Sequence, residues 1–140
     1  MAMKYLLDTN IWSYLQASHP TVLTHFQRLS PQDELFISVI SQAELLSGLR
    51  MMSNKAKQAQ LLTSYQQLML NQVAEILPVT TEVITHYADI LVQLRQIGRP
   101  IPTNDIWIAA IALTHQLILV TNDAHFQHVA NLPLEDWTKL

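Results

Sequence analysis

Short apolar runs alternate with longer segments of helical periodicity along this sequence, and that alternation most strongly limits the possible folds. The runs that predict strands are Tyr5–Leu7, Leu35–Val39, Ala74–Leu77 with Val79, Leu117–Val120 and Leu132–Leu134. The fourth run is apolar at every position, as a strand buried on both faces requires. Strands that alternate with helices build parallel β-α-β units. The sequence therefore predicts an α/β fold with a short, mainly parallel sheet of about five strands flanked by helices.

Helices are predicted where apolar residues recur at spacings of three and four. The predicted helices are Ile11–Ala17, a stripe over Val22–Leu29, Ser41–Leu49, Asn54–Leu70, Thr81–Leu94, a helix from Thr103 or Asn104 to Thr114, and a short one near Phe126. Thr103 or Asn104 is expected to cap its helix. Because 140 residues suit one domain and no linker is evident, we expect a single domain over residues 1–140.

Composition excludes several classes of protein. With 49% hydrophobic and 14% charged residues, the chain is too apolar for a disordered polyelectrolyte. It has no cysteine, so disulfides and thiolate metal sites are impossible. The net charge of -3 argues against a simple nucleic-acid coat, which would be basic. Asp8 interrupts the first apolar run too early for a signal peptide, and no run is long enough to span a membrane. We expect a soluble, cytoplasmic protein.

Four acids lie just after predicted strands or in the first turns of predicted helices. They are Asp8, Glu44, Asp105 and Asp123. Each also has an ordinary structural explanation. Asp8 can cap the following helix, and Glu44 fits a capping box with Ser41. Asp105 suits the positive end of a helix dipole, and Asp123 suits a turn. Ligands of parallel sheets, however, bind at the carboxyl ends of the strands. The shared position of the four acids therefore predicts one acidic site.

Such a cluster requires protons or a cation. Two carboxylates about 4 Å apart repel by roughly 4 kcal/mol at an effective dielectric constant of about 20. Ligands that are all oxygen favour Mg²⁺ or Mn²⁺ over zinc. Histidine ligands are not expected, because the six histidines show no repeated ligand spacing. His125 and His128 lie one helical turn apart, but no further ligand supports them.

Five segments resemble one family in the right order. They are LLDTNIW, SVISQAELLSGLR, PTNDIWIAAIAL, LILVTNDAHF and NLPLEDW, which together span nearly the whole chain. The sequence resembles PIN-domain ribonucleases of the VapC toxin type, which belong to type II toxin–antitoxin pairs. The resemblance implies a PIN-like three-layer α/β/α sandwich. It also implies an Mg²⁺-dependent endoribonuclease, with Mn²⁺ as a possible substitute, that cleaves RNA phosphodiesters by metal-activated water.

The resemblance assigns roles residue by residue. The catalytic acids would be Asp8, Glu44, Asp105 and Asp123. Asp8 and Asp105 would bind the metal most directly, and the other two would complete the site, partly through water. Thr121 would orient a metal-bound water or a carboxylate, and Asn10 would hydrogen-bond Asp8. Both residues can equally well stabilise only their own turns.

The resemblance also implies partners. These are an RNA substrate and a cognate VapB-type antitoxin with a basic C-terminal segment, in a larger complex that contains a toxin homodimer. The apolar faces of Val22–Leu29 and Asn54–Leu70 are expected to form the antitoxin groove. Basic residues that can guide RNA, or simply form solvated surface, are Arg50, Lys55, Lys57, Arg95 and Arg99. Two alternatives remain open: a solitary PIN-domain RNA-processing nuclease, and a catalytically silent interaction module.

Overall fold

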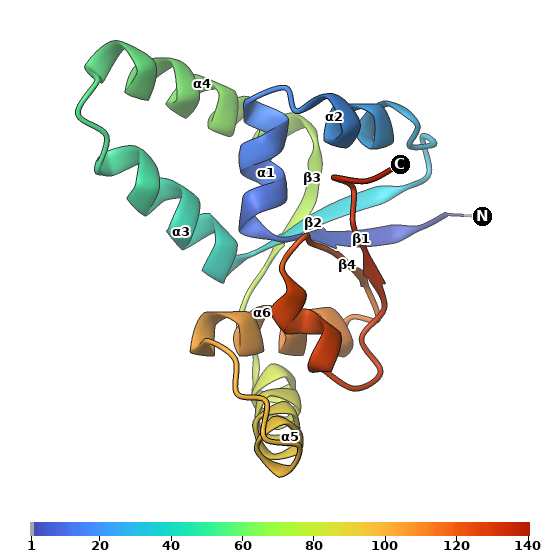
Figure 1. Ribbon diagram of the computed structural model, residues 1–140. Helices are drawn as coiled ribbons and strands as arrows, with labels where there is room; N and C mark the ends of the chain where they lie inside the picture. The colour runs from blue at the N-terminus through green and yellow to red at the C-terminus, as the bar shows by residue number, and fades with distance from the viewer. Residues whose placement is uncertain (1) are drawn as a thin grey trace.

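Five strands form one parallel sheet in this computed structural model, which describes residues 2–140 (Figure 1). The strands are β1 (Lys4–Leu7), β2 (Glu34–Ser38), β3 (Val73–Leu77), β4 (Ile118–Val120) and β5 (Leu134–Glu135). Their order across the sheet is β3-β2-β1-β4-β5, and every neighbouring pair is parallel. This arrangement confirms the predicted α/β fold.

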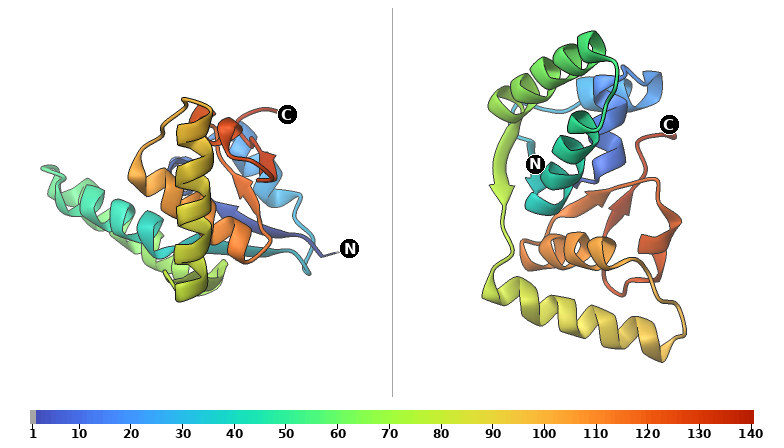
Figure 2. Two further views of the ribbon diagram at one scale, coloured as in Figure 1. Left: turned by 90° about the horizontal axis from the view of Figure 1, so that it is seen from below. Right: turned by 90° about the vertical axis from the view of Figure 1, so that its left-hand side faces the viewer.

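Helices cover both faces of the sheet. They are α1 (Thr9–Gln16), α2 (Pro20–Gln27), α3 (Val39–Arg50), α4 (Lys55–Asn71), α5 (Thr81–Gln96), α6 (Thr103–Thr114) and the short 3₁₀ helix η1 (Ala124–His128). Helices α1 to α4 lie on one side of the sheet (Figure 1). On the other side α6 lies against the sheet and α5 packs on α6, as the right-hand view of Figure 2 shows. The three predicted layers are therefore present.

Alternation along β1 explains why the sheet has two cores. Leu6 joins the core beneath α5 and α6, whereas Tyr5 and Leu7 join the core beneath α1 to α4. Successive side chains of a strand point to opposite faces, so a strand between two helical layers must be apolar at consecutive positions. No helix among residues 2–140 is long and apolar enough to cross a membrane.

The structure shifts several predicted boundaries by one or two residues and leaves Val79 outside β3. The second strand ends at Ser38, and α3 begins directly at Val39. The Ser38 hydroxyl accepts a 3.0 Å hydrogen bond from the Ser41 amide, so Ser38 is the cap and the predicted start at Ser41 is wrong. The last strand is Leu134–Glu135, later than predicted, because Leu132 is buried in the core before the strand begins.

The strand order places three connecting loops side by side. Strand β1 lies between β2 and β4, and Leu7 is paired with Val120. The Asp8 amide continues this ladder by donating to the Val120 carbonyl at 2.9 Å. Because all strands run the same way, the residues that follow β1, β2 and β4 emerge at one edge of the sheet.

Candidate active site

Asp8 is the most buried acid at this edge, with 6% of its surface exposed. It caps α1 by accepting a 2.8 Å hydrogen bond from the Thr9 amide on Oδ1. Its Oδ2 accepts a second 2.8 Å bond from the Thr121 hydroxyl. The predicted cap is thus confirmed, yet capping does not explain why a second donor, Thr121 just after β4, fixes the same carboxylate. No hydrogen bond joins Asn10 to Asp8 within residues 2–140, so that expectation is wrong.

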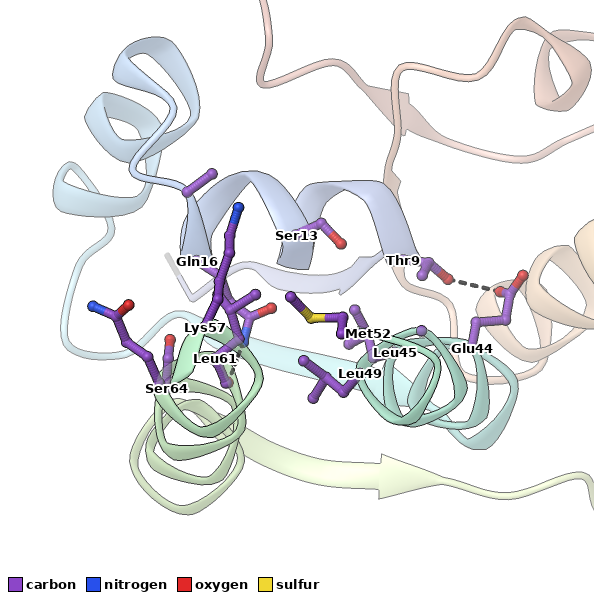
Figure 3. A pocket seen from close by; sticks show the side chains of 13 residues that line it. Thr9, Ser13, Gln16, Glu44, Leu45, Leu49, Met52, Lys57, Leu61 and Ser64 are labelled. Atoms are coloured by element: carbon purple, nitrogen blue, oxygen red, sulfur yellow. Dashed lines mark hydrogen bonds between the residues drawn. The ribbon is translucent and has the colours of Figure 1, made fainter. Parts of the chain in front are cut away.

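Glu44 lies in the second turn of α3 and points toward Thr9 (Figure 3). Its Oε1 accepts a 2.8 Å hydrogen bond from the Thr9 hydroxyl, which also lies 2.9 Å from the Ser41 hydroxyl. The capping box predicted for Glu44 is wrong, because Ser38 and not Ser41 caps this helix. Thr9 instead connects the two acids, since its amide binds Asp8 and its hydroxyl binds Glu44.

Asp105 lies in the first turn of α6, as predicted. The helix begins after Pro102, and no side chain provides a capping hydrogen bond, so the caps predicted at Thr103 or Asn104 are wrong. Only 16% of the Asp105 side chain is exposed. The helix N-terminus favours a negative charge there.

Asp123 follows β4 and caps η1. Its amide donates to the Thr121 hydroxyl at 3.0 Å, and its Oδ1 accepts from the His125 amide at 2.9 Å. Thr121 therefore contacts both Asp8 and the Asp123 backbone. The His125 ring lies beside two of the acids, with Nδ1 at 3.2 Å from Asp105 Oδ2 and 3.1 Å from Asp123 Oδ1.

The acids act on one another electrostatically. The pKa of Asp8 is raised from 3.8 to about 6, chiefly by burial and in smaller part by the charges of Asp105 and Glu44, while hydrogen bonds from Thr121 and Thr9 lower it. Burial also raises the pKa of Asp105, with further contributions from the charges of Asp123 and Glu44 and an opposing hydrogen bond from His125. Within residues 2–140, none of the four acids pairs with a lysine or an arginine.

This electrostatic arrangement predicts a pH-dependent stability. Because the folded chain holds the proton on Asp8 more tightly than the unfolded chain, this contribution is complete below about pH 4 and is lost as the pH rises through about 6. In EDTA, the free energy of unfolding is expected to fall by up to about 3 kcal/mol across this range. Urea titrations from pH 4 to 7.5 measure it. Asp8→Asn should make the free energy of unfolding less dependent on pH. If the wild type and Asp8→Asn instead differ in stability by the same amount at every pH, Asp8 is not the group responsible.

The donor atoms at this edge suit a divalent cation. One oxygen each from Asp105 and Asp123 and a ring nitrogen of His125 all lie within 4.8 Å of one another. Carboxylate oxygens are the ligands that hard divalent cations prefer. A cation would also neutralise the charge that burial makes unfavourable on Asp8. The residues therefore fit a metal ion.

Comparisons with known proteins identify the family. Residues 5–132 match the PIN domain family. Ribonuclease VapC1 of Haemophilus influenzae strain R2866 is 33% identical over 139 residues, which cover 98% of this chain and 100% of that protein. The chain belongs to the VapC family of PIN-domain proteins. This membership confirms the resemblance found in the sequence.

Two further relatives support the family. The tRNA(fMet)-specific endonuclease VapC of Shigella flexneri is 28% identical to this VapC-family protein over 137 residues, covering 97% of this chain and 99% of the relative. The crystal structure of VapBC2 from Rickettsia felis, bound to a DNA fragment from their promoter, contains a chain that is 31% identical. It superposes with a TM-score of 0.83 and covers 96% of this chain and 99% of the other.

Sequence reasoning did not single out Thr9, and it assigned no role at this site to His125. The spacing of His125 to His128 carried no signal, and its proximity to Asp105 depends on how η1 packs against the start of α6. A sequence signal was nevertheless present. In this VapC-family chain, His125 lies only two residues beyond Asp123, so any fold that brings Asp123 to the site also brings His125 close.

A groove of about 590 Å³ lies between α1, α3 and α4 and ends at Thr9 and Glu44 (Figure 3). Its floor includes Leu45, Leu49 and Leu61, and its lining also includes polar side chains such as Lys57. Gly48 lies on α3 within this lining, and a Cβ atom added there would meet nothing within 4 Å. The groove is therefore an open, partly apolar channel that leads to one of the four acids.

Proposed function

We propose that this protein is the endoribonuclease toxin of a VapBC toxin–antitoxin pair and that its activity depends on Mg²⁺. The observation that carries the proposal is the convergence of Asp8, Glu44, Asp105 and Asp123 without a lysine or arginine partner in residues 2–140. The relatives support the same activity, because they are a ribonuclease and a tRNA(fMet)-specific endonuclease. We propose a structured RNA such as a tRNA as the substrate class.

In this proposal Asp8 and Asp105 hold the cation most directly, and Glu44 and Asp123 complete the site. A bound divalent cation supplies Lewis acidity, which lowers the pKa of water and offsets charge on a phosphodiester. The Thr9 amide and the Thr121 hydroxyl hold the Asp8 carboxylate in one orientation before any ligand arrives. The Thr9 hydroxyl does the same for Glu44. This preorganisation removes rotamer freedom that would otherwise be lost on binding.

We propose that basic residues around the α3–α4 connection contact the RNA backbone. Arg50 ends α3, and Lys55 and Lys57 begin α4, so these three cations surround the α3–α4 connection. That connection projects beyond the sheet (Figure 1). Lys57 also lines the groove that ends at Glu44. We propose that these residues attract phosphates while the acids and their cation act on the scissile bond.

The groove suits a VapB-type antitoxin. Its apolar floor suits an apolar helix or strand, and a segment that filled the groove would bring its tip to Glu44. An arginine or lysine at that tip would complement the charge of the acids. The α2 face predicted to line this groove does not do so, because Val22 is buried and Phe26 packs against the core. We also propose pairing of two copies, supported by the exposed apolar side chains Ile84 and Val92 on α5.

The direct test is RNA cleavage by the purified full-length chain. We expect cleavage of RNA in Mg²⁺, no cleavage in EDTA, and recovery when Mg²⁺ is restored, because the four acids alone repel a phosphodiester. End mapping should give products with 5′-phosphates. Cleavage that is equally fast in EDTA would refute metal dependence, and binding of RNA without any cleavage would favour the silent interaction module.

The Glu44→Gln variant separates a catalytic from a structural role. Glutamine retains an oxygen that can accept from the Thr9 hydroxyl, and Glu44 does not cap α3, so the unfolding free energy should change by less than about 0.5 kcal/mol. Cleavage should slow by roughly 100-fold or more, since one of the four charges is lost. Rates and melting temperatures are measured side by side. Full activity in Glu44→Gln would assign this residue a structural role only.

A further inference from the structure

His125 places a ring nitrogen among the acids of the proposed metal site. Its Nδ1 lies 3.2 Å from Asp105 Oδ2 and 3.1 Å from Asp123 Oδ1. We propose that this nitrogen is a direct ligand of the cation, and that it shifts the preference of the site from Mg²⁺ toward Mn²⁺. This inference rests on the proposed metal-dependent function and concerns which ion the site selects.

The ring nitrogen faces more acceptor oxygens than its one hydrogen can bond well. A single ring nitrogen carries at most one hydrogen, yet Nδ1 faces two carboxylate oxygens at nearly equal distances. One of these, Asp123 Oδ1, already accepts a 2.9 Å bond from the His125 amide. The three side-chain atoms together offer more lone pairs than hydrogens. A divalent cation can accept a lone pair from each of these three atoms at once.

The distances also match those between neighbouring ligands of one ion. In an octahedral site with bonds of about 2.1 Å, adjacent ligand atoms are about 3.0 Å apart. The separations of 3.2 and 3.1 Å from Nδ1 to the two oxygens are close to this value. About half of the His125 side chain, 51%, is exposed, which leaves one side of the group open to water ligands. The ring therefore needs little movement to join the first coordination shell.

A nitrogen ligand changes which ion is preferred. Mg²⁺ is a hard ion that is bound almost entirely by oxygen, whereas imidazole is a better ligand for the first-row transition ions. Among these, Mn²⁺ also accepts carboxylate and water ligands readily. A site that combines carboxylates with one imidazole should thus favour Mn²⁺ more than a site built from carboxylates alone.

The test uses the full-length chain with Mn²⁺ as the probe. Pulsed electron paramagnetic resonance detects coupling between bound Mn²⁺ and a directly ligated imidazole nitrogen. We expect this coupling in the wild type and in the control His128→Asn, which removes the other imidazole of η1, and we expect none in His125→Asn. Asparagine can still hydrogen-bond the carboxylates, so a role limited to orienting them would be preserved. Mn²⁺ affinity should fall by roughly 10-fold to 100-fold in His125→Asn, and Mg²⁺ affinity by less than about threefold.

Two outcomes would overturn the inference. One is Mn²⁺ bound at the site without imidazole coupling in the wild type, and the other is equal loss of affinity for both ions in His125→Asn. If the wild type binds no Mn²⁺, the inference also fails. None of these results decides the proposed ribonuclease activity, which depends on cleavage in Mg²⁺ and its loss in EDTA.

Discussion

Asp8→Asn and Asp105→Asn are each expected to abolish metal-dependent RNA cleavage while the chain stays folded. Asparagine has nearly the same shape as aspartate but no charge, so it cannot hold a divalent cation with comparable strength. We expect the rate to fall by at least about 1,000-fold, or about 4 kcal/mol of activation free energy. Cleavage of labelled RNA under single-turnover conditions measures the loss.

Asp8→Asn should lose activity but gain stability. Because burial disfavours the charge on Asp8, its removal should raise the free energy of unfolding at pH 7 in EDTA by about 1 to 3 kcal/mol. Asp89→Asn is the matched control, since Asp89 is an exposed acid on α5 outside the cluster. Asp89→Asn should change neither the cleavage rate nor the free energy of unfolding. Cleavage near the wild-type rate in either site variant would show that the four acids are not the catalytic site.

Gly48→Trp is expected to prevent tight binding of the antitoxin. The indole would occupy the open groove between α1, α3 and α4, where no atom opposes a Cβ at this position. We expect the dissociation constant for the antitoxin to rise at least about 30-fold, which corresponds to about 2 kcal/mol. Titration calorimetry with the purified antitoxin measures the change.

Two variants control for other effects of this substitution. Gly48→Ala adds almost no bulk and should bind normally, while the better helix former raises stability by about 0.5 to 1 kcal/mol. Ser47→Trp places the same indole on the neighbouring exposed position of α3, outside the groove lining, and should also bind normally. If Gly48→Trp binds as tightly as Gly48→Ala, the antitoxin does not use this groove.

The sequence predicted much of this architecture because strand ends and helix starts have local signatures. The apolar runs located the strands, and parallel order then implied that Asp8 and Asp123 would emerge at one edge, where the Thr121 hydroxyl contacts both residues. The start of α3 was misplaced because Val39 is a β-branched residue that also suits a strand. The Ser38 cap overrides that preference, since its hydroxyl satisfies the Ser41 amide.

Features that depend on tertiary packing were not predictable in the same way. The groove requires α1 to pack beside α3 and α4, which lie more than 20 residues later in the sequence, and its depth depends on the missing side chain at Gly48. The contact between His125 and Asp105 joins η1 to α6 across a strand and two turns. Local periodicity contains no information about such distant pairs. The α2 face was assigned to the groove for the same reason, although it packs into the core.

The position of Glu44 at the end of the groove would make one side chain serve both the proposed catalysis and the proposed inhibition. If the proposed function holds, a partner segment that fills the groove reaches Glu44, which the RNA reaction would also need. Substrate and inhibitor would then compete for the same negative charge, so substitutions of Glu44 should alter both affinities together. A variant of this protein could therefore escape its inhibitor through Glu44 only by losing catalytic power. Such a constraint would preserve the binding of the antitoxin to the toxin over evolutionary time.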